Sequence, residues 1–270
     1  MSPRIQNNVE AFNAQRQLVG NNDKLSKAME KLSSGYRINR AGDDAAGLAI
    51  SEKLRGQIGG LAQASRNASD AVSLVQTAEG ALNEVHSMLQ RVRELAVQYK
   101  NGTLSTSDQT AIQSEVNQLK AEIERIGTDT EFNGIDLLNS ATATISFQVG
   151  ASDGQQITVA TISIGAQVTA AVFALSTSST QTDIQQIDDA INNISAARAT
   201  FGAVQNRLEH TISNLASYTE NLTASESRIR DADMASEMVQ FTKLQILQQA
   251  GTSMLSQANQ APQGVLTLLR

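Results

Sequence analysis

His86 and His210 are the first residues to weigh for chemistry, because they are the only histidines in this chain of 270 residues and histidine titrates near neutral pH. A general base needs a positioned acid or nucleophile beside it, and neither sequence neighbourhood offers one. The chain also contains no GxSxG, P-loop, GxGxxG or HExxH motif. We therefore predict that both histidines flank core positions on helices and that the chain is not an enzyme.

Two pairs of aspartates are candidate metal ligands, namely Asp43 with Asp44 and Asp231 with Asp233. A calcium loop would need further oxygen ligands and a glycine at fixed spacing, and the sequence lacks them. We predict instead that Asp43 caps a helix that begins near Asp44. Asp231 and Asp233 are predicted to lie on the solvated edge of a helix, so we expect no metal and no cofactor.

Composition excludes several other classes of protein. Lys and Arg total 21 against 27 Asp and Glu, for a formal net charge of −6, which argues against a nucleic-acid partner. The absence of Cys excludes disulfide scaffolds, thiolate zinc sites and cysteine nucleophiles. The N-terminal segment has no apolar stretch typical of a secretory signal, and no run of about 18 apolar residues occurs. We therefore expect neither a cleaved signal nor membrane insertion.

Small aliphatic residues must build the core, since only 3% of the residues are aromatic. From Ala68 to Tyr99 two interleaved series of apolar residues recur every seven positions, which predicts a coiled-coil helix over residues 61–99 that ends near Asn101-Gly102. A second helix is predicted after an N-cap at Ser105. A third heptad series runs from Ile187 to Leu222. These segments predict one rod-like bundle of long helices.

Both chain ends also carry helical apolar patterns. Ile5, Phe12 and Val19 form one seven-residue series, and Ala11, Leu18, Leu25 and Leu32 form another. Residues 229–258 carry a broader apolar face. Isolated amphipathic helices are marginal in water, so we expect the two ends to pair with each other and then with further copies. The predicted division is a terminal coiled-coil domain of residues 1–40 with 230–270 and a helical rod of residues 41–229.

Residues 139–181 differ from the rest because Ser, Thr, Ala and Gly dominate them. Ile145, Phe147 and Val149 alternate before Asp153-Gly154, and Ile157 and Val159 alternate after it, which predicts a small β-hairpin. The predicted fold class is therefore mainly α, a long coiled-coil bundle with a β-hairpin region and paired terminal helices.

One surface feature stands apart from the predicted seams. Arg91 and Leu95 lie one helical turn apart on a face that the two heptad series leave free. A single exposed leucine is common, so this face is read either as ordinary surface or as a contact with a neighbouring molecule.

Long blocks of this sequence resemble bacterial flagellin. In the N-terminal part they are LSSGYRINRAGDDAAGLAISEKLRGQI at 32–58, QTAEGALNEVHSMLQRVRELAVQ at 76–98 and TEFNG at 130–134. In the C-terminal part they are GAVQNRLEHTISNL at 202–215, ENLTASESRIRDADMASEM at 220–238 and QANQAPQGVLTLLR at 257–270. The chain resembles a short form of the family that lacks outer variable domains.

The resemblance implies a structural subunit that polymerises with copies of itself into the helical filament used for swimming. It implies secretion to the extracellular flagellum through the flagellar type III apparatus and an export chaperone on residues 230–270. Filament cap and hook-junction proteins are further implied partners. In some members the positions of Arg91, Leu95 and Glu115 contact Toll-like receptor 5. Filament-core assembly is assigned to Ile5, Phe12, Val19, Leu25, Leu32, Ile229, Met238, Phe241, Leu247 and Leu255.

Three alternatives remain open on the sequence. A hook–filament junction protein shares the terminal helices, although RINRAGDDAAGLAIS and QNRLEHTISNL match flagellin better. An enzyme carried on a coiled-coil scaffold would need an acid/base or metal cluster, which residues 139–181 do not offer. A membrane-active translocator would need a less interrupted apolar C-terminal helix.

We also expect residues 1–40 and 230–270 to fold only on polymerisation.

Overall fold

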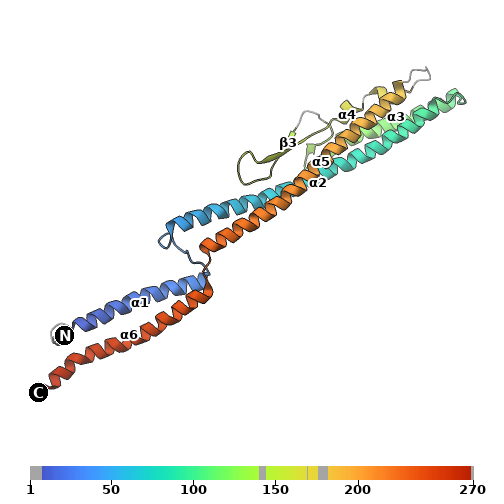
Figure 1. The fold of residues 1–270 in the computed structure, drawn as a ribbon. Coiled ribbons are helices and arrows are strands. Elements are labelled where there is room, and N and C mark those ends of the chain that lie inside the picture. Colours follow the sequence, from blue (N-terminus) through green and yellow to red (C-terminus); the bar gives the residue numbers. More distant parts are fainter. Residues whose placement is uncertain (1–7, 140–143, 169, 176–181, 269–270) are drawn as a thin grey trace. The chain divides into compact units, whose positions relative to one another are not determined.

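The computed structural model of this chain describes residues 8–139, 144–168, 170–175 and 182–268, and it confirms the mainly α fold class. The elements are drawn in Figure 1. In chain order they are α1 (Val9–Ser34), α2 (Ala45–Tyr99), α3 (Thr106–Asp129), β1 (Glu131–Phe132), β2 (Ile135–Asp136), β3 (Thr144–Gln148), β4 (Gln156–Ala160), α4 (Ile164–Gln167), η1 (Ala170–Phe173), α5 (Thr182–Arg230) and α6 (Met234–Leu268). No described helix is both long and apolar enough to cross a membrane.

The chain divides into two compact units. The terminal unit contains the residues up to Gly56 and those from Asn221 onward, and the bundle unit contains residues 57–220. The division predicted from the sequence, at residues 40 and 230, stays a prediction.

The bundle unit is built on the predicted heptad seams of α2, α3 and α5. Both series of α2 are buried, including Val75, Leu82 and Leu89 at 0% exposure. The seams of α3 and α5 meet them through Val116, Ile123, Ile187, Ile194, Phe201 and Leu208, all of which are buried. Aliphatic side chains of this size allow helices to approach closely and bury a continuous stripe.

Helix α2 is longer than the heptads predict, because it begins at Ala45 rather than near residue 61. Its end at Tyr99 agrees with the stop signal at Asn101-Gly102. Helix α3 starts as expected after Ser105, whose hydroxyl accepts a hydrogen bond from the amide of Asp108 while the Asp108 carboxylate accepts one from the amide of Ser105. This reciprocal pair is a capping box.

The predicted hairpin is present as β3 and β4, which pair antiparallel with Phe147 opposite Ile157. Gly154 has a φ of +82°, which glycine adopts at no steric cost. The hairpin lies on α2, where the Asn67 side-chain amide donates to the carbonyl of Gln148 at 3.0 Å. It is half-buried on one strand and more deeply buried on the other, so its apolar side chains extend the bundle core.

A second, smaller hairpin was not predicted. Strands β1 and β2 pair through the turn at Asn133-Gly134, where both residues have positive φ angles of 52° and 75°. Asn-Gly is the preferred pair for such a turn, so the signal was present in the sequence. The single turns α4 and η1, which come after the β3–β4 hairpin, pack against α3, where Gly127 faces Ile164.

The terminal unit contains the antiparallel pair of α1 and α6 (Figure 1). The Asn8 side-chain amide donates to the carbonyl of Ala258 at 2.7 Å near one end of the pair. Lys31 lies 3.9 Å from Glu237 near the other end. The prediction that the chain ends pair with each other is therefore confirmed. The helical apolar pattern of residues 229–258 is interrupted in the structure, because α5 ends at Arg230 and α6 begins at Met234.

Candidate functional site

The pairing seam of α1 and α6 is narrow. On α1 it is formed by the series that contains Leu18, Leu25 and Leu32. On α6 the partly or fully buried positions alternate by four and three residues, namely Glu237, Phe241, Leu244, Gln248, Gly251, Leu255 and Ala258. Only Ala28 and Leu244 are fully buried among the described side chains of these helices. The pair therefore buries much less apolar surface than the bundle does.

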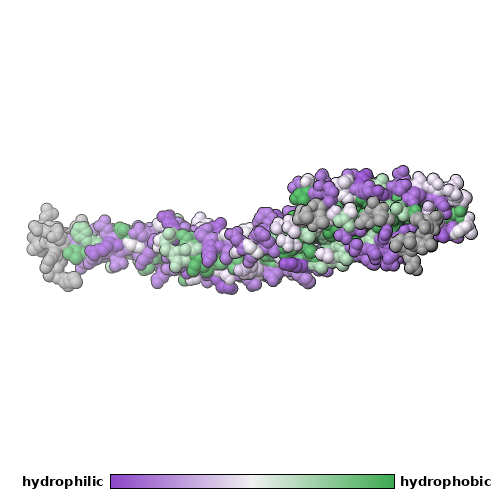
Figure 2. Space-filling model, turned by 90° about the horizontal axis from the view of Figure 1, so that it is seen from above, coloured by the Kyte–Doolittle hydropathy of each residue, from purple (hydrophilic) through white to green (hydrophobic). Residues whose placement is uncertain are grey.

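A second apolar face points away from this seam on each helix. On α1 it carries Val9, Phe12 and Val19, with exposures of 54–61%. At about 100° per residue Val9 lies opposite Leu18, and Phe12 and Val19 lie about a third of a turn around the helix from it. On α6 the exposed apolar residues are Met234, Met238, Val239, Ile246, Leu247 and Met254. Figure 2 shows hydrophobic patches breaking the polar surface along the helices that end in the grey termini.

These exposed side chains are concentrated in the terminal unit. Fifteen large hydrophobic residues are exposed among the described residues, and twelve of them belong to this unit. The bundle unit contributes only Val97, Ile135 and Tyr218. Extended apolar surface on one part of a soluble protein marks an interaction site.

The structure places the predicted assembly residues on both faces. Phe12, Val19, Met238 and Leu247 are exposed on the outward faces. Leu25, Leu32, Ile229, Phe241 and Leu255 are half-buried, and Ile5 lies outside the described residues. The sequence grouped these positions as one set, whereas the structure separates an inward set from an outward set.

A joint follows α1 and precedes α6; it consists of residues 35–44 and 230–233. Tyr36 and Asp231 form an antiparallel bridge, flanked by hydrogen bonds from the Arg37 amide to the Arg230 carbonyl at 2.7 Å and from the Ala232 amide to the Gly35 carbonyl at 2.9 Å. The N-terminal and the C-terminal segment therefore both leave helical geometry at the point where Tyr36 pairs with Asp231.

Arg230 is the central side chain of the joint. Its guanidinium lies 4.9 Å from the centre of the Tyr36 ring and 2.6 Å from the carboxylate of Glu52. That hydrogen bond from Arg230 is the main reason why the pKa of Glu52 lies below its ordinary value of 4.5. The Arg37 guanidinium donates to the carbonyl of Ile229, near the C-terminal end of α5, where cations are favoured.

Of the four aspartates, Asp44 and Asp233 cap helices and Asp43 closes a turn, and both predictions about them are wrong. Asp44, not Asp43, caps α2, because its carboxylate accepts from the Gly47 amide at 2.8 Å. Asp43 closes the preceding turn, and the amides of Arg40 and then Asn39 lower its pKa.

Asp231 and Asp233 do not lie on a helix edge, because the helix is interrupted there. Asp233 caps α6 by accepting from the amides of Ala235 and Ser236. Asp231 accepts from the hydroxyl of Ser227 at 2.6 Å. Nowhere in the described residues do three His, Asp or Glu side chains gather where they could hold a metal ion.

The sequence missed Tyr36, Arg37 and Arg230 as joint residues. Gly35, with a φ of +76° at the end of α1, and Asp233, three residues before Ser236, are the signals that could have located the joint. Glycine commonly ends a helix and Asp commonly starts one.

The surface containing Arg91, Leu95 and Glu115 is only partly as predicted. Arg91 is exposed and its guanidinium lies 2.9 Å from Glu115 on α3. Hydrogen bonds from Arg91 to Glu115 first, and then to Glu94, raise the pKa of Arg91. Leu95 is buried at 1% exposure, so it is a core residue beneath this surface rather than part of it.

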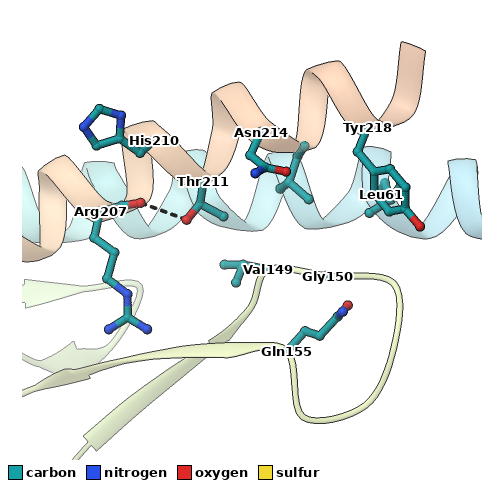
Figure 3. Close-up of a pocket in the computed structure, with 10 residues that line it drawn as sticks. Leu61, Val149, Gly150, Gln155, Arg207, His210, Thr211, Asn214 and Tyr218 are labelled. Carbon is teal, nitrogen blue, oxygen red and sulfur yellow. Dashed lines mark hydrogen bonds between the residues drawn. The ribbon is translucent and has the colours of Figure 1, made fainter. Parts of the chain in front are cut away.

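A groove of about 800 Å³ lies in the bundle unit between α5 and the β3–β4 hairpin. Figure 3 shows Arg207, His210 and Tyr218 on α5, with Gln155 on the hairpin side. The close-up also shows the bond from the Thr211 hydroxyl to the carbonyl of Arg207, at 2.8 Å. His210 is exposed beside buried Leu208, and His86 is half-buried beside buried Val85, so both histidines flank core positions as predicted.

Family models match both parts of the chain. Residues 5–143 match the bacterial flagellin N-terminal helical region, and residues 184–269 match the bacterial flagellin C-terminal helical region. The flagellin of Halalkalibacterium halodurans is 54% identical, over 98% of this chain and 99% of that protein. A flagellar filament 33 kDa core protein of Treponema phagedenis is 48% identical over 98% and 99%.

Solved structures agree with these relationships. The crystal structure of Bacillus cereus flagellin is 35% identical with a TM-score of 0.52, and the match covers 60% of this chain and 94% of that one. A structure described as a flagellar hook-associated protein from Vibrio parahaemolyticus has a TM-score of 0.60 at 14% identity, covering 70% and 100%. At that identity it shows the fold alone, so the junction-protein alternative is the weaker one.

Proposed function

This chain belongs to the bacterial flagellin family, a family of structural filament proteins rather than enzymes, and we propose that its copies polymerise through the outward faces of α1 and α6. The observation that carries the proposal is the concentration of exposed large hydrophobic residues in the terminal unit. Burying one such side chain contributes roughly 1.5–3 kcal/mol. A contact between unlike faces that does not close on itself generates a helical filament.

The two sets of assembly residues have different roles in this proposal. The inward residues Leu25, Leu32, Ile229, Phe241 and Leu255 hold α1, α6 and the joint together within one subunit. The outward residues Phe12, Val19, Met238 and Leu247 contact neighbouring copies, and Ile5 is assigned to the same core. Because the seam within one chain is narrow, residues 1–40 and 230–270 fold fully only when neighbours cover them.

Seeded elongation of purified subunits, followed by electron microscopy, tests this assignment. Ile246→Glu places a charge in the outward face of α6 and should abolish elongation, because an unpaired buried charge is costly. Gln118→Glu adds the same charge at an exposed polar position of α3 in the bundle unit and should elongate like the unaltered chain. Equal elongation of both variants would refute the outward faces as the contact surface.

The same membership supports further partners. We assign the subunit to the extracellular flagellum, reached through the flagellar type III export apparatus, with an export chaperone on residues 230–270. The exposed apolar residues of α6 are the kind of surface that a chaperone must cover before assembly. A filament cap protein and hook-junction proteins complete the proposed set. Co-purification of the chaperone with the full chain, and its loss in Ile246→Glu, would support the same surface.

Recognition by Toll-like receptor 5 is proposed for the exposed pair of Arg91 and Glu115. Both side chains are about half exposed and can form hydrogen bonds with a receptor. Receptor reporter cells should respond to the unaltered monomer, and Arg91→Ala should weaken the response. Arg125→Ala, which removes an exposed and similarly paired arginine of α3, is the matched control. A silent unaltered monomer would end this proposal.

A further inference from the structure

The methionines of this chain are unevenly placed. The sequence has six, and five lie among the described residues. Four of these belong to α1 and α6 and are exposed, with fractions of 53% for Met29, 46% for Met234, 49% for Met238 and 64% for Met254. The fifth, Met88, is half-buried against the bundle core. Since the chain has no Cys, the thioethers are its most oxidisable sulfur atoms.

A hydroperoxide oxidises such a side chain in one step. The lone pair of the methionine sulfur attacks one peroxide oxygen, a sulfur–oxygen bond forms and the oxygen–oxygen bond breaks. The sulfur loses two electrons, and the second oxygen leaves with a proton as water or an alcohol. The product is a sulfoxide, which is polar and can be reduced enzymatically.

Because these side chains are exposed on α1 and α6, their oxidation would change the surface that contacts neighbouring copies. Met234 and Met238 lie one helical turn apart at the start of α6. Met254 lies seven residues beyond Leu247, and at about 100° per residue these two residues flank the other side of the α1–α6 seam, where both are exposed. A sulfoxide at any of them would place a polar oxygen where a neighbouring copy must bury apolar surface. Burying one methionine changes an equilibrium constant about tenfold or more.

We propose that the four patch residues Met29, Met234, Met238 and Met254, which are exposed on both flanks of the seam, are modified by a hydroperoxide before assembly, and that the modification blocks polymerisation. Assembly covers these residues and protects them. This inference rests on the proposed function, because it requires that α1 and α6 be buried in the filament.

The test uses the full chain and hydrogen peroxide. Monomer is treated, the peroxide is removed with catalase, and each sulfoxide is quantified by mass spectrometry before seeded elongation. We expect oxidation at the four patch residues ahead of Met88, and a rise of about tenfold or more in the subunit concentration needed for elongation. Methionine sulfoxide reductase should restore elongation, and intact filaments should resist the same treatment.

Substitutions locate the effect, with the ratio of treated to untreated elongation as the readout. Met238→Leu with Met254→Leu should bring that ratio closer to one, whereas Met88→Leu should leave it as low as in the unaltered chain. The inference is overturned if fully oxidised monomer elongates normally, if the reductase restores nothing, or if filaments oxidise as fast as monomer. Failure of untreated monomer to elongate on seeds would instead refute the proposed function.

Discussion

Gly47 shows how tightly the start of α2 is built at the level of single atoms. A Cβ at this position would overlap the carboxylate of Asp44 and would lie 2.8 Å from the Cδ1 atom of Ile38. Asp44 caps the helix and Ile38 is buried at 1% exposure, so neither has free space. The absence of a side chain is therefore required where the joint meets α2.

Gly47→Ala should consequently destabilise the first turn of α2 by about 1–3 kcal/mol, the range for overpacking a filled site. Alanine normally stabilises a helix by about 0.5–1 kcal/mol relative to glycine, so the sign is opposite to the usual one. Gly56→Ala is the control, because nothing lies within 4 Å of its added Cβ, and it should stabilise. Hydrogen exchange of the α2 amides in the turn around each substituted residue measures the two effects, and equal effects would contradict the packing argument.

Leu95 is buried, although its spacing from the two apolar series predicted that it is exposed. The sequence identified two apolar series on α2, but a third, Leu74, Ala81, Met88 and Leu95, repeats with the same spacing and is also partly or fully buried. A helix that contacts two neighbours buries a wider stripe than the narrow seam of a two-stranded coil. The spacing showed that α2 is helical, but the number of its neighbours was set by α3 and α5.

Leu95→Ala should therefore lower the free energy of unfolding of the bundle unit by about 2–5 kcal/mol, as expected for a cavity in a core. Val97→Ala alters a side chain of the same helix that is 51% exposed and should change stability by less than about 0.5 kcal/mol. Urea unfolding of both variants provides the comparison. A near-neutral Leu95→Ala would place this residue back on the surface.

At the scale of elements, the joint determines how α1 meets α6. The two backbone hydrogen bonds between residues 35–37 and 230–232 pin the inner ends of the helices, and Arg230 holds that contact against Tyr36 and Glu52. The helical rise then sets which residues of α1 and α6 lie opposite each other farther from the joint. Weakening the joint should therefore increase opening of the first turns of α6.

Arg230→Met keeps the apolar stem but removes the stacked cation, which is worth about 1 kcal/mol at a partly exposed site. We expect faster hydrogen exchange at Ala232, whose amide bonds to Gly35, and in the first turns of α6. Arg55→Met removes the other, exposed arginine that bonds to Glu52, and such pairs contribute little. If both substitutions gave the same exchange rates, the role assigned to Arg230 would be lost.

Acid should loosen the same contact. The pKa of Glu52 is lower in the folded chain than its ordinary value of 4.5, so its ionised form stabilises the joint. That contribution is fully present above about pH 4.5 and is lost as the pH falls through the folded pKa. Glu52→Gln should therefore weaken the pH dependence of exchange at Ala232 between about pH 6 and pH 3. Asp43, whose pKa is also lowered, retains its own share, and an unchanged profile in Glu52→Gln would contradict the assignment.

The elements themselves were predictable to different degrees. Long heptads and the Ser105 cap located most of α2, α3 and α5, because their apolar periods are long and uninterrupted. The interruption between α5 and α6 was not predicted, because apolar residues occur directly before it at Ile229 and directly after it at Met234. Asp233, the cap of α6, is the signal in the sequence for this break, and Gly35 marks the facing end of α1.

For the whole molecule, the sequence does not show which apolar face of α1 packs within the same chain and which one stays exposed. Phe12 and Val19 recur every seven residues just as Leu18 and Leu25 do, and both series fit a helix. The structure assigns Leu18 to the inner seam, where its Cδ1 atom would lie 2.8 Å from a Cβ built on Gly251. Phe12 and Val19 remain exposed, because the side chains that would cover them belong to no part of the described chain.

The final prediction concerns the assembled molecule. If neighbouring copies bury the outward faces, protease should trim residues 1–40 and 230–270 from the monomer and leave 41–229 largely intact. In filaments both ends should survive the same treatment, because cleavage requires local unfolding that burial makes costly. Mass spectrometry of timed digests gives the cut sites, and the amount of the surviving 41–229 fragment serves as the internal reference. Equal resistance of the ends in monomer and filament would mean that α1 and α6 are stable without neighbours, and the outward faces would then need another explanation.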